Sequence, residues 1–152
     1  MKLAEALLIR ADMQKQLTSL KSRIESNIQV QEGETPDETP TELMITAQQL
    51  NNDLHTLIGK IQRTNASVKL DNGRTMLDLL VERDMLLERH RIIMSALKEA
   101  RELNQRYSLR EIKWIVTVPV KDLQKQADDV STKIRQVNTK IQSANWLIDL
   151  VN

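Results

Sequence analysis

The sequence predicts a mainly α-helical fold, an up-and-down bundle of four long helices with coiled-coil packing and short β segments in the connections. Apolar residues recur at alternating steps of three and four in four long stretches, which is the periodicity of helices that bury one face. The chain has no Phe, one Tyr and two Trp, so its core must be aliphatic, as suits helix-on-helix packing. Its 152 residues fit a single domain, residues 1–152.

The first predicted helix covers residues 2–26, and its seam contains one charged interruption. After it, Ile28 and Val30 alternate with polar residues in 27–31, which indicates a short strand. Residues 32–42 contain one Gly, two Pro and five acidic residues but no basic one, so we expect a solvated acidic loop. The seam of the helix consists of Leu3, Ala6, Arg10, Met13, Leu17, Leu20 and Ile24.

The second predicted helix covers residues 40–63. Thr39 is placed to cap it, Pro40 suits its first position, and Glu42 lies three residues after the cap. The following segment contains Asn72-Gly73, a pair favoured where both central residues of a hairpin turn have positive φ. A small hairpin is therefore expected there. The seam of the helix consists of Leu43, Ala47, Leu50, Leu54, Leu57, Ile61 and Thr64.

The third and fourth predicted helices cover residues 75–105 and 120–151. Between them, a stretch that ends at Pro119 predicts a second strand over residues 112–118. One face of it carries Ile112, Trp114, Val116 and Val118, and the other carries Lys113, Ile115 and Thr117. The third seam contains Leu79, Leu86, Ile93, Leu97 and Ala100, and the fourth contains Leu123, Ala127, Val130, Ile134, Val137, Ile141, Ala144 and Ile148. Seams of this length commonly extend beyond what one small chain covers, so we expect homo-oligomers.

Composition argues against several classes of function. With 22 basic and 21 acidic residues, a net charge of +1 gives no field to attract nucleic acid or an anionic membrane. No apolar run approaches the ~18 residues of a membrane-spanning helix. The chain has no Cys and its N-terminal residues lack the apolar core of a signal peptide, so we expect a cytoplasmic protein.

The residues that stand out as a candidate site are polar side chains on predicted core faces. Arg83 and His90 share the seam of the third helix, with Asp84 and Arg89 beside them. Two interpretations remain open: a structural ion-pair network that fixes register, joined by Arg10 and Asp12 of the first helix, or a pocket for a small anion. The structural one is favoured.

Known catalytic and cofactor motifs are missing from the sequence. It has three Gly and two His, with no glycine-rich phosphate loop and no Glu-x-x-His pair such as di-iron bundles use. We therefore assign no catalytic residue, metal ligand or cofactor, and favour a role that is not enzymatic.

Several segments together resemble a family of small bacterial proteins named septicolysin: MKLAEALLIRAD, VQEGE, IQRTN, LLVERDMLLERH, REIK and ANW. The resemblance spans nearly the whole chain. It implies an all-helical, coiled-coil-rich subunit that forms homo-oligomers, and it supplies no catalytic residues.

Three functions follow, in order of preference. The first is a cytoplasmic homo-oligomeric protein with a structural or interaction role. The second is a bundle that binds a small molecule or anion, or acts as an enzyme, through the Arg83 and His90 cluster. The third is a membrane-active toxin, as the family name suggests, although the absence of Cys conflicts with a thiol-activated cytolysin.

Overall fold

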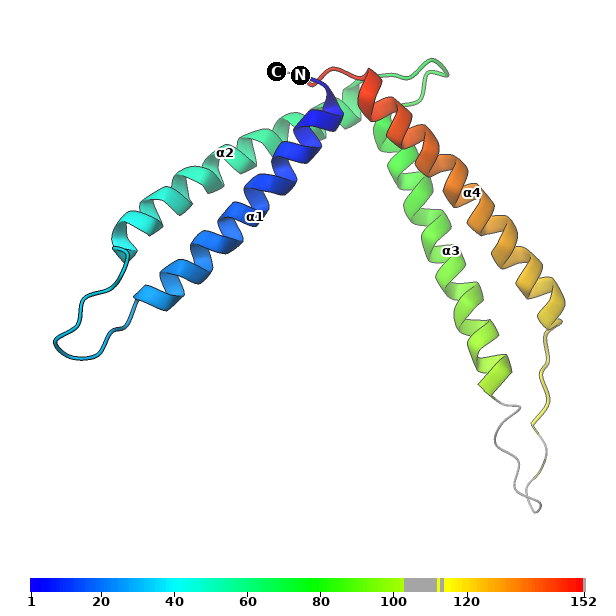
Figure 1. Cartoon of the computed structure of the whole chain (residues 1–152). Helices are drawn as coiled ribbons and strands as arrows, with labels where there is room; N and C mark the ends of the chain where they lie inside the picture. Colours follow the sequence, from blue (N-terminus) through cyan, green and yellow to red (C-terminus); the bar gives the residue numbers. More distant parts are fainter. Residues whose placement is uncertain (103–111, 113, 152) are drawn as a thin grey trace. The chain divides into compact units, whose positions relative to one another are not determined.

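The computed structural model describes residues 1–102, 112 and 114–151. It contains four helices (Figure 1): α1 Leu3–Asn27, α2 Pro40–Ser67, α3 Met76–Glu102 and α4 Val120–Leu147. They divide between two compact units, one of Met1–Thr75 with Ala144–Asn152 and one of Met76–Ser143. The predicted class, mainly α-helical with four helices, is confirmed. The expectation of a single domain stays a prediction.

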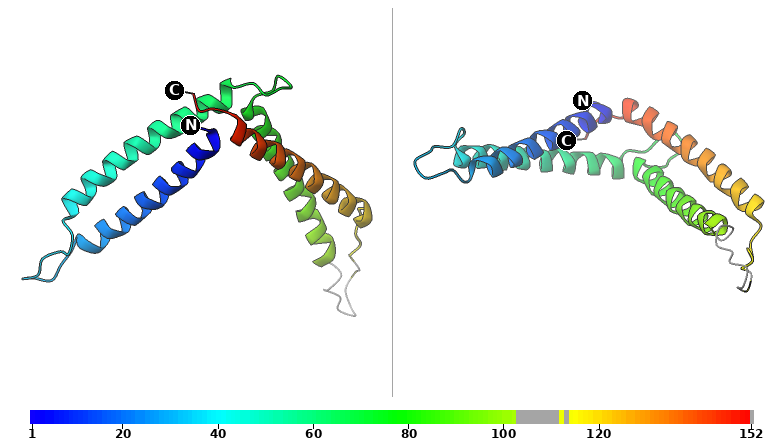
Figure 2. Two further views of the ribbon diagram at one scale, coloured as in Figure 1. Left: turned by 45° about the horizontal axis from the view of Figure 1, so that its top comes forward. Right: turned by 60° about the horizontal axis from the view of Figure 1, so that its bottom comes forward.

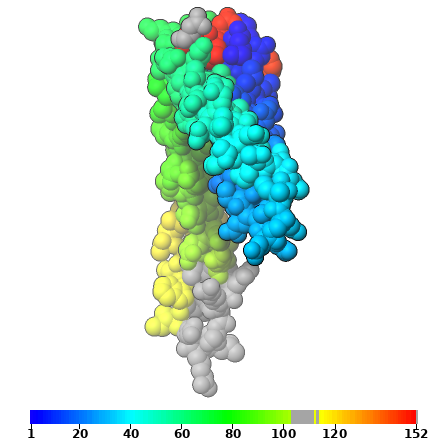
Figure 3. Space-filling model, turned by 90° about the vertical axis from the view of Figure 1, so that its left-hand side faces the viewer, coloured from blue at the N-terminus to red at the C-terminus, as the bar shows by residue number. Residues whose placement is uncertain are grey.

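In the first unit, α1 and α2 form an antiparallel helical hairpin, and both views in Figure 2 show them side by side. The predicted seams lie on the faces that the two helices bury. Leu20 of α1 and Leu43, Leu54 and Ile61 of α2 are all buried, and their neighbours in the seams are half-buried. Figure 3 shows the packed side chains of this hairpin from the outside.

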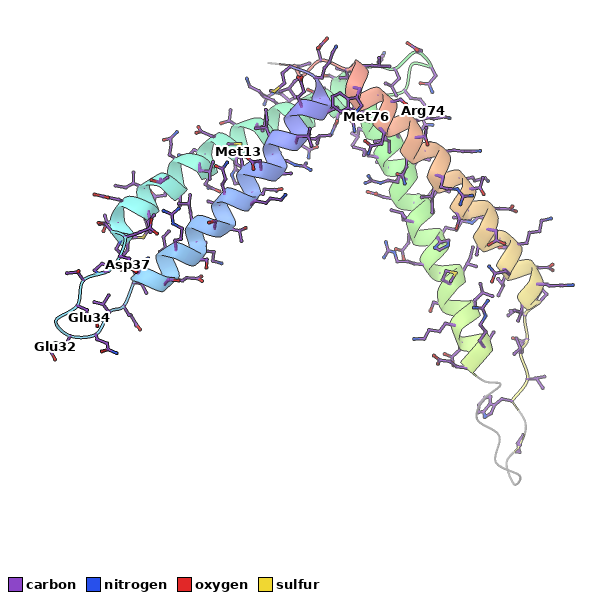
Figure 4. The ribbon with its side chains drawn as sticks, in the orientation of Figure 1. Met13, Glu32, Glu34, Asp37, Arg74 and Met76 are labelled. Carbon is purple, nitrogen blue, oxygen red and sulfur yellow. The ribbon has the colours of Figure 1, made fainter. Side chains whose placement is uncertain are left out.

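The tip of the first hairpin is the predicted acidic loop. Gly33 adopts a φ of +92°, which favours glycine because a Cβ would clash with the backbone. The amide of Glu34 donates to the carbonyl of Gln31 at 3.0 Å, which closes a turn. The labelled side chains of Glu32, Glu34 and Asp37 in Figure 4 mark this loop.

The chain ends pair with each other inside the first unit, which the sequence did not predict. The amide of Leu3 donates to the carbonyl of Ile148 at 2.9 Å, and the amide of Leu150 donates to the carbonyl of Met1 at 2.9 Å. Lys2 Nζ lies 2.9 Å from Asp149 Oδ1. The predicted fourth helix, which was to run to residue 151, therefore ends at Leu147, because the residues after it pair with residues 1–3.

A hydroxyl inside the first unit also holds the end of the chain. Thr64 is fully buried, and its Oγ1 donates to the carbonyl of Lys60 at 2.8 Å. The same oxygen accepts a hydrogen bond from the amide of Val151 at 3.0 Å. The last turn of α2 is thus tied to the segment that follows α4.

The expected turn at Asn72-Gly73 is present, but its type differs from the prediction. Gly73 donates to the carbonyl of Leu70 at 2.8 Å, and the amide of Leu70 donates to the carbonyl of Arg74 at 2.7 Å. Only Gly73, with φ +76°, has a positive φ. This arrangement is a tight turn followed by a glycine bulge, the usual three-residue hairpin connection, rather than a turn with two positive φ values.

In the second unit, α3 and α4 form another helical hairpin (Figures 1 and 2). Arg101 Nη2 donates to Gln124 Oε1 at 2.9 Å, which joins the end of α3 to the start of α4. The buried side chains of this pair are those of the predicted seams: Leu79, Leu86, Ile93, Leu97 and Ala100 on α3, and Ala127, Val130, Val137 and Ile141 on α4.

The two predicted strands are wrong as far as the described residues show. Asn27 belongs to α1, residues 28–31 form no strand, and neither do Ile112 or residues 114–118. Lys113 lies outside the described residues. The described part contains only isolated bridges, Lys2 with Asp149 and Lys69 with Thr75. Alternation over five to seven residues was not sufficient to form a strand, because a strand also needs a partner backbone.

Candidate functional site

Arg83 and His90 occupy seam positions of α3. They lie seven residues apart, about two helical turns, and therefore on the same side of the helix. Both are half-buried, while Leu86 between them is 5% exposed. Polar side chains thus interrupt the apolar contact of α3 at two adjacent levels.

Arg83 already has an anionic partner. Its Nε and Nη2 donate to Asp84 Oδ1 at 3.0 and 2.8 Å. The side chains are 33% and 65% exposed, so this ion pair lies at the surface of the unit rather than in a closed, buried network. Ion pairs with this exposure contribute little to stability.

Arg89 does not join Arg83 and His90. It is exposed, and six residues, about 240° around the helix axis, separate it from Arg83. The guanidinium of Arg89 therefore belongs to a different side of α3. The sequence reasoning grouped the two by proximity along the chain, which does not decide the side of a helix.

Arg10 and Asp12 belong to α1, in the first unit. Asp12 is exposed, and its Oδ2 accepts a hydrogen bond from Gln16 Nε2 at 2.8 Å. Arg10 is half-buried in the seam of α1, and its Nε is shielded from solvent without a hydrogen-bond partner. Arg10 interrupts its seam as Arg83 interrupts that of α3.

The acidic loop has its own electrostatic contact. Arg23 of α1 makes a two-pronged ion pair with Glu38, with Nε donating to Oε2 at 2.8 Å and Nη2 to Oε1. The amide of Glu38 donates to Asn27 Oδ1 at 3.1 Å. The hydrogen bonds from Arg23 lower the pKa of Glu38 below its usual value. These contacts fix the base of the loop against the end of α1.

An open hollow lies within the acidic loop, lined by residues that include Asn27, Gln31, Glu34 and Asp37. No group of three or more His, Cys, Asp or Glu in the described ranges is arranged to hold a metal ion. We therefore assign no ion to this loop.

The second face of α3 is the feature that sequence reasoning missed. Leu77, Val81, Met85 and Ile92 are 44%, 60%, 61% and 62% exposed. Their spacings of four, four and seven residues place them on one stripe, the outer face of α3. Leu86, nine residues or about two and a half turns after Leu77, lies on the opposite side. The spacing was visible in the sequence, but a strong seam on the other side obscured it.

Helix α4 provides a comparison inside the same unit. Between Lys121 and Ser143, every exposed side chain of α4 is polar or charged, as expected for a helix that meets water on its outer side. Helix α3 instead exposes large apolar side chains on its outer side as well as burying its seam. The exposed Glu88 lies on the same outer side, three residues after Met85 and four before Ile92. Among the described residues, no helix is long and apolar enough to cross a bilayer.

Comparison with known proteins gives a family but no activity. The fold is similar to a solved structure described as a functionally unknown conserved protein from Corynebacterium diphtheriae, with 32% sequence identity, a TM-score of 0.92 and 99% coverage of both chains. No curated protein matches. A model of a family of unknown function, DUF6847, matches residues 10–150, and the chain belongs to that family.

Proposed function

We propose that this protein is a cytoplasmic, self-associating helical protein with a structural or interaction role. The observation that carries the proposal is the outer face of α3. Four large apolar side chains on one stripe remain 44% to 62% exposed, whereas the outer side of the neighbouring helix α4 is polar. Covering such a stripe removes apolar area from water, which favours association.

The assembly we infer completes a helical bundle. A hairpin of α3 and α4 that packs through α3 on the same hairpin of a second copy would give four helices with α3 at the centre. Such a bundle has the layered packing of coiled-coil-like folds. The resemblance to the septicolysin family supports this proposal, because it implies a helical subunit that forms homo-oligomers.

The alternative of an anion-binding or enzymatic bundle has weaker support. It needs Arg83 to offer its donors to a ligand, but two of these donors already bind Asp84. The carboxylate also repels an anion.

Sedimentation equilibrium at micromolar concentration tests the proposal. The wild type should form a defined oligomer, and Met85→Glu with Ile92→Glu should reduce association at least tenfold because both side chains belong to the outer face of α3. Thr132→Glu with Thr139→Glu is the matched control, since both residues are exposed on α4 at the same spacing of seven. A wild type that remains monomeric, or a control pair as damaging as the test pair, contradicts the proposal.

A further inference from the structure

Helices α2 and α4 repeat each other along the chain. Each contains 28 residues, and each residue of α2 has a counterpart in α4 eighty positions later. Residues of similar kind are buried or half-buried at the same places in both helices. They are Leu43 and Leu123, Ala47 and Ala127, Leu50 and Val130, Leu54 and Ile134, Leu57 and Val137, Ile61 and Ile141, and Asn65 and Asn145.

Helices α1 and α3 repeat in the same way, at a spacing of seventy-three positions. The spacing differs because the chain between the starts of the two helices is seven residues longer in the second pair. Arg10 and Arg83, which interrupt the two seams, occupy equivalent positions. Self-similarity of this kind is the signature of an internal repeat. The other buried or half-buried pairs are Leu3 and Met76, Ala6 and Leu79, Met13 and Leu86, Leu17 and His90, and Leu20 and Ile93.

The backbone pairing beside the helices repeats with the same two spacings. In what we call the first pairing, the segment after α2 meets the residue before α3 through the bridge of Lys69 with Thr75. In the second pairing, the segment after α4 meets the residue before α1 through the bridge of Asp149 with Lys2. Lys69 and Asp149 are eighty positions apart, and Lys2 and Thr75 are seventy-three apart. The two pairings are therefore equivalent.

The hydrogen bonds of the two pairings correspond as well. The amide of Leu70 donates to the carbonyl of Arg74 at 2.7 Å. At the equivalent positions, the amide of Leu150 donates to the carbonyl of Met1 at 2.9 Å. The ends of the chain thus reproduce a contact that the other pairing makes across a turn.

The two pairings differ in how the chain connects them. Residues 71–73, which end in Asn72-Gly73, form the turn that closes the first pairing. The second pairing is open because it contains both ends of the chain, and two residues, 151–152, follow Leu150. One added glycine would make these two residues three, and it would follow Asn152 as Gly73 follows Asn72.

An additional hydrogen bond holds the open pairing. The amide of Val151 donates to the buried Oγ1 of Thr64 at 3.0 Å. Ala144 occupies the position of α4 that is equivalent to Thr64, and it has no hydroxyl to accept such a bond. The hydroxyl of Thr64 therefore supports the pairing that lacks a covalent connection.

We propose that the chain is an internal repeat of one helical hairpin with its backbone pairing, and that its two ends occupy the place of the turn 71–73. The two closures are then interchangeable: the chain can be opened at this turn and joined at its ends without loss of the fold. Exposed turns are where such circular permutation is tolerated. This inference does not depend on self-association.

A circular permutant tests the interchange. It begins at Gly73, runs to Asn152, continues through one added glycine to Met1 and ends at Asn72. The permutant should keep the wild-type helix content and unfold within about 5 °C of the wild type, because one pairing is closed as the other is opened. Circular dichroism during heating, at equal protein concentration, measures both. A permutant that does not fold, or that unfolds far below the wild type, contradicts the proposal.

The length of the link provides a matched control. The same permutant with eight added glycines joins the ends without a tight turn. If the ends lie as a turn requires, the longer link should give an equal or slightly lower midpoint, because a longer loop costs more entropy to close. A midpoint that rises by more than about 5 °C with the longer link would show that the single glycine strains the ends.

Closing the chain without opening it separates the two pairings. The chain cyclised through the same single glycine, and left intact at residues 71–73, should unfold at a higher temperature than the linear wild type, because closure restricts the unfolded chain. A cyclic form less stable than the wild type would contradict the placement of the ends. A stable cyclic form beside a permutant that does not fold would show that the turn cannot be opened, and the interchange would be wrong.

Discussion

Individual polar residues in the seams show how local pairing replaces a buried network. Arg83 lies at a core-facing position, but it turns to the adjacent carboxylate of Asp84, whose side chain is 65% exposed. His90 stays half-buried one level further along. Because water reaches the ion pair, removing one partner leaves the other solvated, and the cost of a buried unpaired charge does not arise.

We therefore predict that Arg83→Met combined with His90→Leu keeps or raises stability. Both changes place apolar groups at seam positions, and the ion pair they remove is an exposed one worth at most about 1 kcal/mol. Urea unfolding of the wild type, both single variants and the double variant measures this. Phosphate and sulfate should shift the wild type and the double variant equally. Stabilisation of the wild type alone by either anion would show that the cluster is a binding site.

At the scale of elements, contacts with the end of α1 hold the acidic loop in place. Arg23 and Asn27 both bind Glu38, so a single acidic residue links the returning chain to the helix that it left. The pKa of Glu38 is lowered by these contacts with Arg23. Because the pKa of Glu38 is lowered in the folded state, the ion pair stabilises the folded state at pH values above the usual carboxyl pKa of ~4.3. This stabilisation is lost as the pH falls through the folded-state pKa of Glu38.

We therefore predict that the loss of stability in the variant Glu38→Gln depends on pH, whereas Glu34→Gln causes no loss. Glu38→Gln should be slightly less stable than the wild type at pH 7, and the difference should disappear in acid, where Glu38 of the wild type is protonated. Glu34→Gln, an exposed position in the same loop, should match the wild type at every pH. Urea unfolding at a series of pH values from 7 down into strong acid measures how far the stability of each variant differs from that of the wild type. A constant gap for Glu38→Gln across this range would exclude the ion pair as its cause.

The elements also show what the sequence could and could not predict. Helix positions and buried faces were predictable, because steps of three and four report one side of a helix directly. Leu79, Leu86 and Ile93 are buried as expected. The pairing of the chain ends was not predictable, because backbone hydrogen bonds between residues 1–3 and 148–150 leave no side-chain signature. Arg83 and Asp84 form an ion pair, but spacing alone could not show that the pair is solvated.

At the scale of the whole chain, Thr64 joins segments far apart in the sequence. Its buried Oγ1 accepts from the amide of Val151, next to the pairing of Lys2 with Asp149. Thr64→Val keeps the shape of the side chain but removes the acceptor, so we predict a loss of about 1 to 3 kcal/mol. Thr56→Val is the control, since Thr56 is exposed and its hydroxyl binds only within its own helix, to Asn52. Chemical denaturation compares them, and equal losses would show that the bond to Val151 contributes nothing.

The pairing of Lys2 with Asp149 has a consequence for the order in which the chain folds. The hairpin of α1 and α2 can form early, because its contacts are short in sequence and close small loops. The contact between residues 2 and 149 joins segments far apart in the sequence, so it cannot form until residue 149 has emerged from the ribosome. The first unit must then wait for its final covering segment, and its apolar N-terminal end is accessible to chaperones and proteases during that interval.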